Sequence, residues 1–440
     1  MTKRMTVALA ATALLTLGGC GIFKGGKPKT PVIGNRVPIL ATEAGALADP
    51  AIAGAPVTLP AAAVNPGWAQ PGGNAAKSVG HLALGATLTR AWTVEVTTGG
   101  NRARLAAAPV VADGRVYVVD VDAVVTAYAA DTGARLWSTP IHTDKENSSS
   151  RFGGGASFAD GKVYATSGLG DVVALNATDG ALLWKKKPGG PLRGSPTLAN
   201  GIVYALSQDS QIFALAQADG TVQWQQSASL ETQGVFGVAA PAAAQGTVVA
   251  GFASGELNAY RYENGQVLWQ DALSRTSVST SVSALSDIDA DPVIDNGKAY
   301  AIGQGGRLVS IDLATGQRQW EQNFASIASP WVAGDWLFVV TDDARLVCIA
   351  KGSGKVRWLT QLKRYDNVAK RKGAIQWTGP VLAGDRLLLL NSKGEIVSAS
   401  PTDGTVLSTI EGDGAFDLPP VVANNTLYVI SQDGKLTAYR

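Results

Sequence analysis

The feature of this chain that most restricts its fold is a unit of 29 residues that recurs seven times without a gap. Each copy starts at a proline or an alanine, and it ends 28 positions later at a tryptophan, or at a serine in the last copy: Pro109–Trp137, Ala156–Trp184, Pro196–Trp224, Pro241–Trp269, Pro292–Trp320, Pro330–Trp358 and Pro380–Ser408. From Trp92 to Ser408 there are 316 residues (408 − 92) over seven intervals, or about 45 per repeat. That period is typical of the blades of a β-propeller.

The pattern inside each copy is that of β-strands. In the third copy, four short runs rich in β-branched and aromatic residues are separated by turn residues, and other copies follow it. An Asn-Gly or Asp-Gly pair, which suits a tight hairpin, separates the first two runs in four copies. One glycine before the last run recurs in every copy, at Gly133, Gly180, Gly220, Gly265, Gly316, Gly354 and Gly404. Each unit is therefore predicted to be a four-stranded antiparallel meander, and this glycine to adopt a backbone conformation that is costly for a side chain.

An eighth copy is incomplete and predicts how the fold closes. It starts at Pro420, and the sequence stops at Arg440 after 21 of the 29 residues, before the last strand. A strand of the missing kind, GATLTRAW at residues 85–92, precedes the first complete copy and ends in Trp92. A ring of meanders leaves only short, protected edges. We therefore predict an all-β fold over residues 85–440, an eight-bladed β-propeller of four-stranded antiparallel blades, with the last blade closed by the N-terminal strand.

The first 19 residues are predicted to be a lipoprotein signal peptide. A basic start is followed by an apolar run at 5–17 that is too short to span a bilayer. The next residues, Leu17-Gly18-Gly19-Cys20, resemble the bacterial lipobox, which implies that Cys20 is lipidated. Gly21, where an aspartate would signal retention in the inner membrane, favours the outer membrane by resemblance to known sorting rules.

Residues 20–84 are predicted to form a flexible tether that starts at the lipidated cysteine, because they are rich in Ala, Gly and Pro and lack periodicity. Two stretches inside it, 35–40 and 65–73, carry large apolar side chains. Either stretch can dock on the protein's own body, dock on a partner, or carry its apolar residues incidentally.

Charge and cysteine content exclude some classes of function. Removal of the signal peptide takes two of the 37 basic residues and none of the 35 acidic ones, so the mature chain is balanced at 35 against 35. A nucleic-acid partner is not expected, because it needs a clustered basic excess. With Cys20 lipidated, Cys348 is left alone in an apolar run and is predicted to be a buried strand thiol.

The chemistry of a catalytic site is also missing from the sequence. The two histidines, His81 and His142, do not have the spacing of metal ligands. The glycine-rich stretch 151–158 runs into a strand, which favours an inter-blade loop over a phosphate-binding loop. We therefore expect no catalytic residue, no cofactor and no metal site.

The tryptophan-ended repeat resembles that of pyrroloquinoline-quinone dehydrogenases, but this chain lacks their adjacent cysteine pair and identifiable calcium ligands. With its lipobox, eight repeats and strand-exchanged closure, the chain resembles more strongly the BamB family of the outer-membrane β-barrel assembly machinery. That resemblance implies a non-catalytic scaffold, lipid-anchored in the outer membrane and facing the periplasm. Its partners would be BamA and the other subunits of the BAM complex, and it would assist the folding and insertion of outer-membrane proteins. A periplasmic quinoprotein dehydrogenase, or a binding propeller with another partner, remains the alternative.

The same resemblance implies residues that contact BamA. The stretch 284–294 resembles the family segment that leads into the fifth blade, whose two aspartates correspond to Asp287 and Asp289. The loop into the fourth blade aligns with a family loop that carries Leu, Leu and Arg, where this chain has Gln233, Val235 and Phe236. Because both stretches join consecutive blades on one face, we expect them to lie close together and to form a small interface. The alternative is that these are solvated loops.

A second long linker is basic. Between Trp358 and Pro380 it carries Lys363, Arg364, Lys370, Arg371 and Lys372. Three interpretations of this loop at 361–373 remain: it contacts an acidic surface of a partner, it contacts anionic lipid headgroups, or it is simply a solvated loop. Strand addition of unfolded outer-membrane proteins to exposed blade edges is a further hypothesis.

Overall fold

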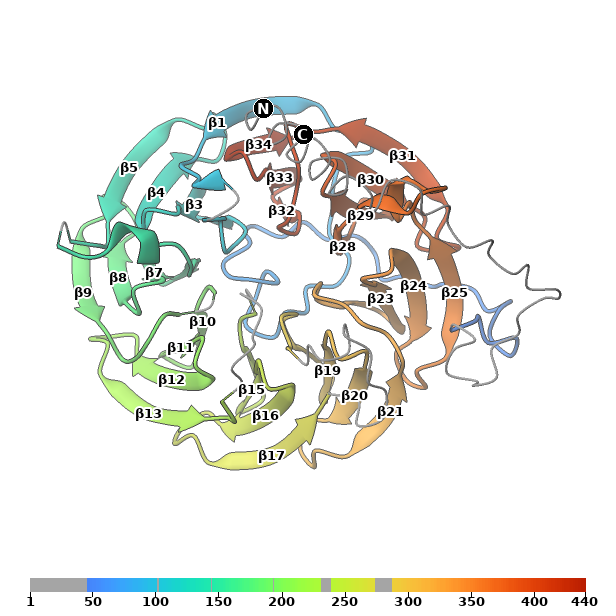
Figure 1. The fold of residues 1–440 in the computed structure, drawn as a ribbon, viewed down its shortest axis with the longest axis horizontal. Helices are drawn as coiled ribbons and strands as arrows, with labels where there is room; N and C mark the ends of the chain where they lie inside the picture. Colours follow the sequence, from blue (N-terminus) through green and yellow to red (C-terminus); the bar gives the residue numbers. More distant parts are fainter. Residues whose placement is uncertain (1–45, 101–102, 144, 193, 231–238, 274–286) are drawn as a thin grey trace, which may run out of the picture. The chain divides into compact units, whose positions relative to one another are not determined.

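A computed structural model describes residues 46–100, 103–143, 145–192, 194–230, 239–273 and 287–440. These residues form eight four-stranded antiparallel sheets arranged as a ring, so the predicted propeller is confirmed (Figure 1). Blades 1 to 4 consist of β2 (Val110–Ala112), β3 (Arg115–Val119), β4 (Val124–Ala129) and β5 (Arg135–Pro140); β6 (Ala156–Ala159), β7 (Lys162–Thr166), β8 (Val172–Asn176) and β9 (Leu182–Lys186); β10 (Thr197–Ala199), β11 (Ile202–Leu206), β12 (Gln211–Ala216) and β13 (Val222–Ser227); and β14 (Ala242–Ala244), β15 (Thr247–Gly251), β16 (Glu256–Arg261) and β17 (Val267–Ala272). Blades 5 to 8 consist of β18 (Val293–Asp295), β19 (Lys298–Ile302), β20 (Leu308–Asp312) and β21 (Arg318–Gln322); β22 (Trp331–Ala333), β23 (Trp336–Val340), β24 (Arg345–Ala350) and β25 (Val356–Gln361); β28 (Trp377–Ala383), β29 (Arg386–Asn391), β30 (Glu395–Ala399) and β31 (Val406–Glu411); and β32 (Val421–Ala423), β33 (Thr426–Ile430), β34 (Lys435–Tyr439) and β1 (Arg90–Glu95).

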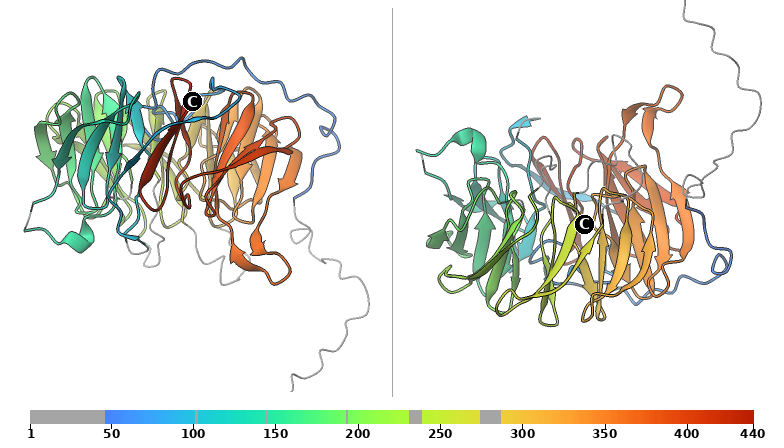
Figure 2. Two further views of the ribbon diagram at one scale, coloured as in Figure 1. Left: turned by 90° about the horizontal axis from the view of Figure 1, so that it is seen from above. Right: turned by 60° about the horizontal axis from the view of Figure 1, so that its bottom comes forward.

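Two further elements lie in the linkers between blades. The 3-10 helix η2 (Ser148–Ser150) is in the linker from blade 1 to blade 2. A two-stranded hairpin of β26 (Tyr365–Asn367) and β27 (Lys372–Ala374) is in the linker from blade 6 to blade 7. Both project from the same face of the ring (Figure 2).

The ring closes as predicted, with the N-terminal strand as the outermost strand of blade 8. β1 pairs with β34 in an antiparallel ladder in which Trp92 lies opposite Ala438 and Glu95 opposite Lys435. Backbone hydrogen bonds extend the ladder beyond the strands, since Thr89 and Arg440 donate to each other's carbonyls at 2.6 and 2.8 Å. The two ends of the propeller are therefore held in one sheet, next to the C-terminus in Figure 1.

The recurring tryptophan and the recurring glycine form one contact between neighbouring blades. Each indole Nε1 donates to a carbonyl just before the glycine turn of the following blade, at 2.8–3.1 Å, from Trp92 to Ala130 through to Trp358 and Pro401. The seven glycines have φ between +70° and +76°. A Cβ on any of them would come closer than 3.0 Å to the preceding blade's tryptophan. The predicted backbone conformation is confirmed, and the glycine also leaves room for the indole.

The structure explains why one copy has serine in place of tryptophan. Ser408 belongs to β31, so its blade faces blade 8. In blade 8 the turn before the last strand does not exist, because β34 and β1 come from opposite ends of the propeller and are joined only by hydrogen bonds. There is no glycine turn to receive an indole at this interface.

Two glycines with the same backbone conformation allow the cost of backbone strain to be separated from the cost of a clash with the tryptophan. Gly180 and Gly201 both have φ of +74°, but a Cβ on Gly180 would lie 2.5 Å from the Trp137 ring, whereas one on Gly201 meets nothing within 4 Å. Gly201→Ala should cost about 1 kcal/mol from backbone strain alone. Gly180→Ala should cost about 1–3 kcal/mol more because it overpacks the blade interface. Equilibrium unfolding of both variants measures this difference, and equal losses would contradict the proposed contact.

Residues 65–84, which we call the inner belt, run around the inside of the ring and bond to the innermost strand of every blade (Figure 1). Each blade has a hydrogen bond to at least one residue of the belt. In the order blade 8 and then blades 1 to 7, the bonded pairs, one for each blade and belt residue first, are Asn65 with Val422, Trp68 with Val111, Ala69 with Phe158, Gln70 with Leu198, Ala75 with Ala243, Ala76 with Ile294, Gly80 with Trp331, and Leu82 with Leu382. The innermost strand of a blade has one edge without a sheet partner. The belt therefore satisfies polar backbone groups that would otherwise line the central channel.

The segment before the belt also lies on the propeller. Asp49 donates its N–H to the carbonyl of Val356 at 2.7 Å, and Arg357 Nε donates to the carbonyl of Ala55 at 2.7 Å, both on the outer strand of blade 6. Residues 46–84 are thus bound to the body, which differs from the flexible tether expected up to residue 84. The stretch 65–73 docks on the protein itself, with Trp68 4% exposed, while 20–45, including Cys20 and the stretch 35–40, lies outside the described residues.

Candidate functional site

The propeller has two unlike faces. One carries the linkers between blades, including η2 and the β26–β27 hairpin, and we call it the linker face (Figure 2). The other is crossed by the segment that leads to the inner belt, drawn in blue on the opposite side from the hairpin. Long loops on a rigid scaffold are the usual place for binding. The linker face is therefore the candidate interaction surface.

The two predicted aspartates lie where this face meets blades 4 and 5. Ile288, between them, is fully buried and donates its N–H to the carbonyl of Phe252 in blade 4 at 3.2 Å. In blade 5, Gln304 donates its backbone N–H to the carbonyl of Asp287 at 3.0 Å and its side-chain Nε2 to Asp289 Oδ2 at 2.8 Å. The segment 287–289 is thus a wedge between two blades.

Burial limits what these carboxylates can do directly. The residues Asp287 and Asp289 are only 1% and 5% exposed. A side chain this buried offers almost no surface to a partner, but it can hold the end of a linker in place. The other predicted contact residues, Gln233, Val235 and Phe236, lie outside the described residues.

The described ends of the two predicted linkers do come together. Asp291 Oδ1 accepts the backbone N–H of Ala240 at 2.6 Å, which ties the linker into blade 5 to the linker into blade 4. The N–H of Asp291 in turn donates to Ser329 Oγ at 2.9 Å, before blade 6. Asp291 was not singled out in the sequence, although its place directly before Pro292, at the start of a repeat, was a signal that it fixes that start.

A buried lysine of the inner belt faces this region. Lys77 is 3% exposed, and its Nζ donates to Thr197 Oγ1 at 3.1 Å. Burial lowers the pKa of Lys77 to about 8, partly opposed by the negative charge of Asp291. Burial likewise raises the pKa of Asp291, with the charge of Lys77 acting against that change. The sequence held no signal for this pair, because its members are more than 200 positions apart.

The lowered pKa of Lys77 predicts a pH dependence of stability. Between about pH 8 and 10.5 the unfolded chain keeps the Lys77 proton that the folded chain releases, so the contribution of Lys77 to the free energy of unfolding should rise with pH, by at most about 1.4 kcal/mol per unit. Buried tyrosines and the Cys348 thiol, whose pKa values are raised, contribute with the opposite sign at alkaline pH, so the test compares Lys77→Met with the control Lys187→Met, whose lysine is exposed. In denaturant unfolding between pH 8 and 10, the free energy of unfolding of the control should rise relative to that of Lys77→Met. A difference between the two variants that does not change with pH would contradict the assignment.

Other site chemistry is limited among the described residues. Within the described ranges, no three His, Cys, Asp or Glu side chains are grouped as metal ligands. His81 has a structural role, since its Nδ1 lies 2.8 Å from the carbonyl of Pro60 and its Nε2 accepts the N–H of Asp385. Cys348 is fully buried as predicted, and burial raises the pKa of its thiol. No helix in the part of the chain that the structure describes is long and apolar enough to cross a membrane.

Together, the repeat, the tryptophan–glycine contacts and the exchanged strand define a β-propeller of quinoprotein-like repeats that presents its linkers on one face. A family model described as "Outer membrane protein assembly factor BamB" matches residues 83–143 and 122–360. The chain is also 31% identical over 356 residues to the outer membrane protein assembly factor BamB of Salmonella typhimurium, covering 80% of this chain and 88% of that relative. The chain therefore belongs to the BamB family, and the predicted resemblance is confirmed.

Solved structures agree on the fold. The crystal structure of BamB from Moraxella catarrhalis has a TM-score of 0.67 at 20% identity and covers 80% of this chain and 100% of its own. A europium-containing methanol dehydrogenase has a TM-score of 0.63 at 15% identity, with 84% of this chain and 89% of its own covered. At these identities both likenesses concern the fold alone.

Proposed function

We propose that the protein is a non-catalytic scaffold of outer-membrane β-barrel assembly that holds BamA on its linker face. The observation that carries this proposal is its membership of the BamB family across most of the propeller. The architecture fits such a role, because a rigid ring presents several linkers side by side. The proposal includes lipidation of Cys20, which would anchor the protein in the outer membrane facing the periplasm, and association with the other BAM subunits.

Within this proposal the five predicted contact residues divide into two roles. Val235 and Phe236, with Gln233 beside them, would make the direct contact, as apolar side chains often do at the centre of an interface. Asp287 and Asp289 would hold the linker into blade 5 in position without touching the partner themselves, because both side chains are buried. The bond between Asp291 and Ala240 supports this division, since it links the two linkers.

Pull-down from detergent-solubilised membranes tests the function and the site separately. The parent should recover BamA, Val235→Ser/Phe236→Ser should lose most of it, and Leu182→Ser/Leu183→Ser on the outer edge of blade 2 should recover it like the parent. Absence of BamA from the parent's partners would refute the assembly role. Equal recovery with the serine variant at 235 and 236 would refute only the site.

Contact with unfolded client proteins is a finer part of the proposal. The residue before the repeat-ending tryptophan, or before Ser408 in blade 7, is an exposed leucine on four outer strands: Leu136, Leu183, Leu268 and Leu407 are 38–57% exposed. These strands lie at free sheet edges, to which an extended segment can add. On blade 6 the protein's own segment occupies this edge, where Val356 accepts the N–H of Asp49 and is 3% exposed.

A photo-cross-linking residue tests client contact at equivalent positions. At Leu183 it should capture outer-membrane proteins during their assembly in cells. At Arg357, the same position in blade 6, it should not, because Ala55 and its neighbours cover that edge. Equal capture at both positions would contradict binding at free blade edges.

A further inference from the structure

The β26–β27 hairpin is an element added to the propeller, and its base is held firmly. Trp377 Nε1 donates to the carbonyl of Lys363 at 3.0 Å, and Ile375 donates its N–H to the carbonyl of Arg364 at 3.0 Å. Gln361 Nε2 donates to the carbonyls of Asp343, Ala344 and Leu362. The hairpin therefore stands out from the linker face as a fixed projection (Figure 2).

The hairpin concentrates positive charge. Residues 361–374 contain five basic residues and one acidic one, a net charge of +4 in a chain whose total is +2, so the rest of the chain carries −2. The acidic residue, Asp366, forms ion pairs with Lys393 and with Lys363, and the Lys393 hydrogen bond holds its pKa below the usual range. In residues 287–440, all of which are described, the guanidinium groups of Arg364 and Arg371 have no acidic partner.

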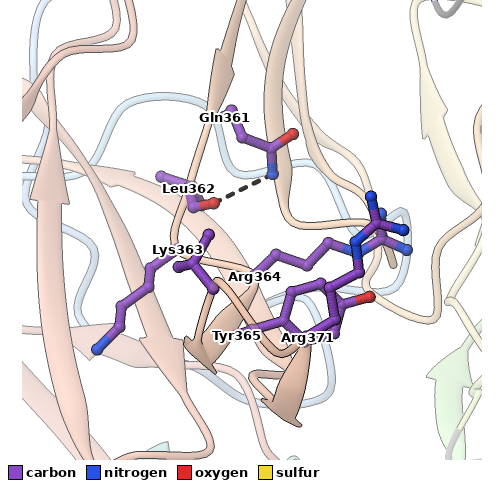
Figure 3. A pocket seen from close by; sticks show the side chains of 7 residues that line it. Gln361, Leu362, Lys363, Arg364, Tyr365 and Arg371 are labelled. Atoms are coloured by element: carbon purple, nitrogen blue, oxygen red, sulfur yellow. Dashed lines mark hydrogen bonds between the residues drawn. The ribbon is translucent and has the colours of Figure 1, made fainter. Parts of the chain in front are cut away.

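These two arginines line one hollow that extends from the base of the hairpin to its turn (Figure 3). The pocket has a volume of about 440 Å³, and Leu362, Tyr365 and Val368 supply its apolar surface. The Arg364 guanidinium lies 5.4 Å from the centre of the Tyr365 ring, which orients its donors. In Figure 3 the guanidinium groups of Arg364 and Arg371 extend toward the same side of the pocket.

We propose that this pocket binds an acidic segment of a protein partner, with carboxylates on the guanidinium groups and an apolar side chain against Tyr365 and Val368. Guanidinium groups bind carboxylates through two parallel hydrogen bonds, and an aromatic ring stacked on one of them reduces the entropy lost on binding. A concave pocket suits side chains, whereas a hairpin that binds a membrane needs large apolar residues at its tip. The tip here offers Val368 alone, which is 69% exposed.

Fluorescence anisotropy with purified protein tests this inference independently of the assembly role. The probe is a labelled peptide of alternating glutamate and valine, compared with one in which glutamine replaces glutamate. Arg364→Ala/Arg371→Ala should weaken binding of the acidic peptide by roughly tenfold or more. Arg135→Ala/Lys187→Ala, which removes the same charge from exposed positions on blades 1 and 2, should change it less than about twofold.

Further measurements separate specific binding of carboxylates by the guanidinium groups from general attraction between opposite charges. Arg364→Lys/Arg371→Lys keeps the charge and should recover only part of the affinity, because lysine lacks the guanidinium fork. The proposal is overturned if the parent does not bind the acidic peptide, if it binds the glutamine peptide equally well, or if the lysine variant binds like the parent. It is also overturned if the alanine variant loses binding to phosphatidylglycerol vesicles but keeps binding to the peptide, since the hairpin would then be a membrane contact.

Discussion

Deletion of residues 85–92 is expected to destabilise the whole propeller, by at least about 4 kcal/mol. The deletion removes Trp92, which is 8% exposed, donates to the carbonyl of Ala130 and packs under Gly133 of blade 1. Loss of a buried tryptophan costs about 3–5 kcal/mol by itself. The deletion also removes residues 90–92, half of β1, so the end of β34 nearest the C-terminus loses its outer partner strand.

The matched control for this deletion is removal of an equal length of chain from the hairpin, residues 366–373. Those residues are exposed or form only the two-stranded sheet outside the blades. Thermal unfolding followed by circular dichroism should show a large drop in melting temperature for the first deletion and a small one for the second. A deletion of 85–92 that melts like the parent would refute the closure of the ring by this strand.

Truncation of the inner belt is the second large expected effect. Trp68→Ala/Leu82→Ala should cost about 5 kcal/mol or more, since each side chain is almost fully buried and large-to-alanine changes in a core cost about 2–5 kcal/mol. Trp68 stacks against Trp331 of blade 6 with ring centroids 6.1 Å apart. Leu82 exchanges two backbone hydrogen bonds with blade 7, through Leu382 and Gly384.

Denaturant unfolding measures the loss, and limited proteolysis shows where it occurs. The belt variant should be cut within residues 46–84 far faster than the parent. Val64→Ala, at a position 56% exposed next to the belt, should behave like the parent in both assays. If the belt variant resisted proteolysis as the parent does, the belt would contribute little to holding the blades together.

The blades themselves were predictable because their contacts repeat. A tryptophan ends each complete unit except the last, and a glycine turn recurs four residues before the end. The same contact, such as that between Trp184 of one blade and Gly220 of the next, therefore recurs from blade to blade. The incomplete eighth copy and the isolated Trp92 belonged to the same pattern, which is why ring closure was predictable too. The absent tryptophan at Ser408 was visible in the sequence, but its reason appeared only when β34 and β1 lay side by side.

The candidate site was predictable in its location and less so in its chemistry. The spacing of Asp287 and Asp289 after Trp269 placed them in a linker between blades 4 and 5, where the structure has them. Their burial depends on packing of Ile288 between two blades, for which a linker sequence holds no periodic signal. The role of Asp291 also depends on a partner, Ala240, that is 51 positions away.

Repetition within the sequence determined the architecture. Each blade contacts its neighbours through equivalent positions of the repeat, and seven copies make those positions recognisable in the sequence. Tertiary structure alone decided what the Ala/Gly/Pro-rich N-terminal segment does. The inner belt binds mainly through backbone hydrogen bonds, and a backbone group is the same in every residue, so composition does not reveal its partner. Small side chains that indicate a flexible tether also let the belt approach eight strands closely, and only the closed ring supplies those strands.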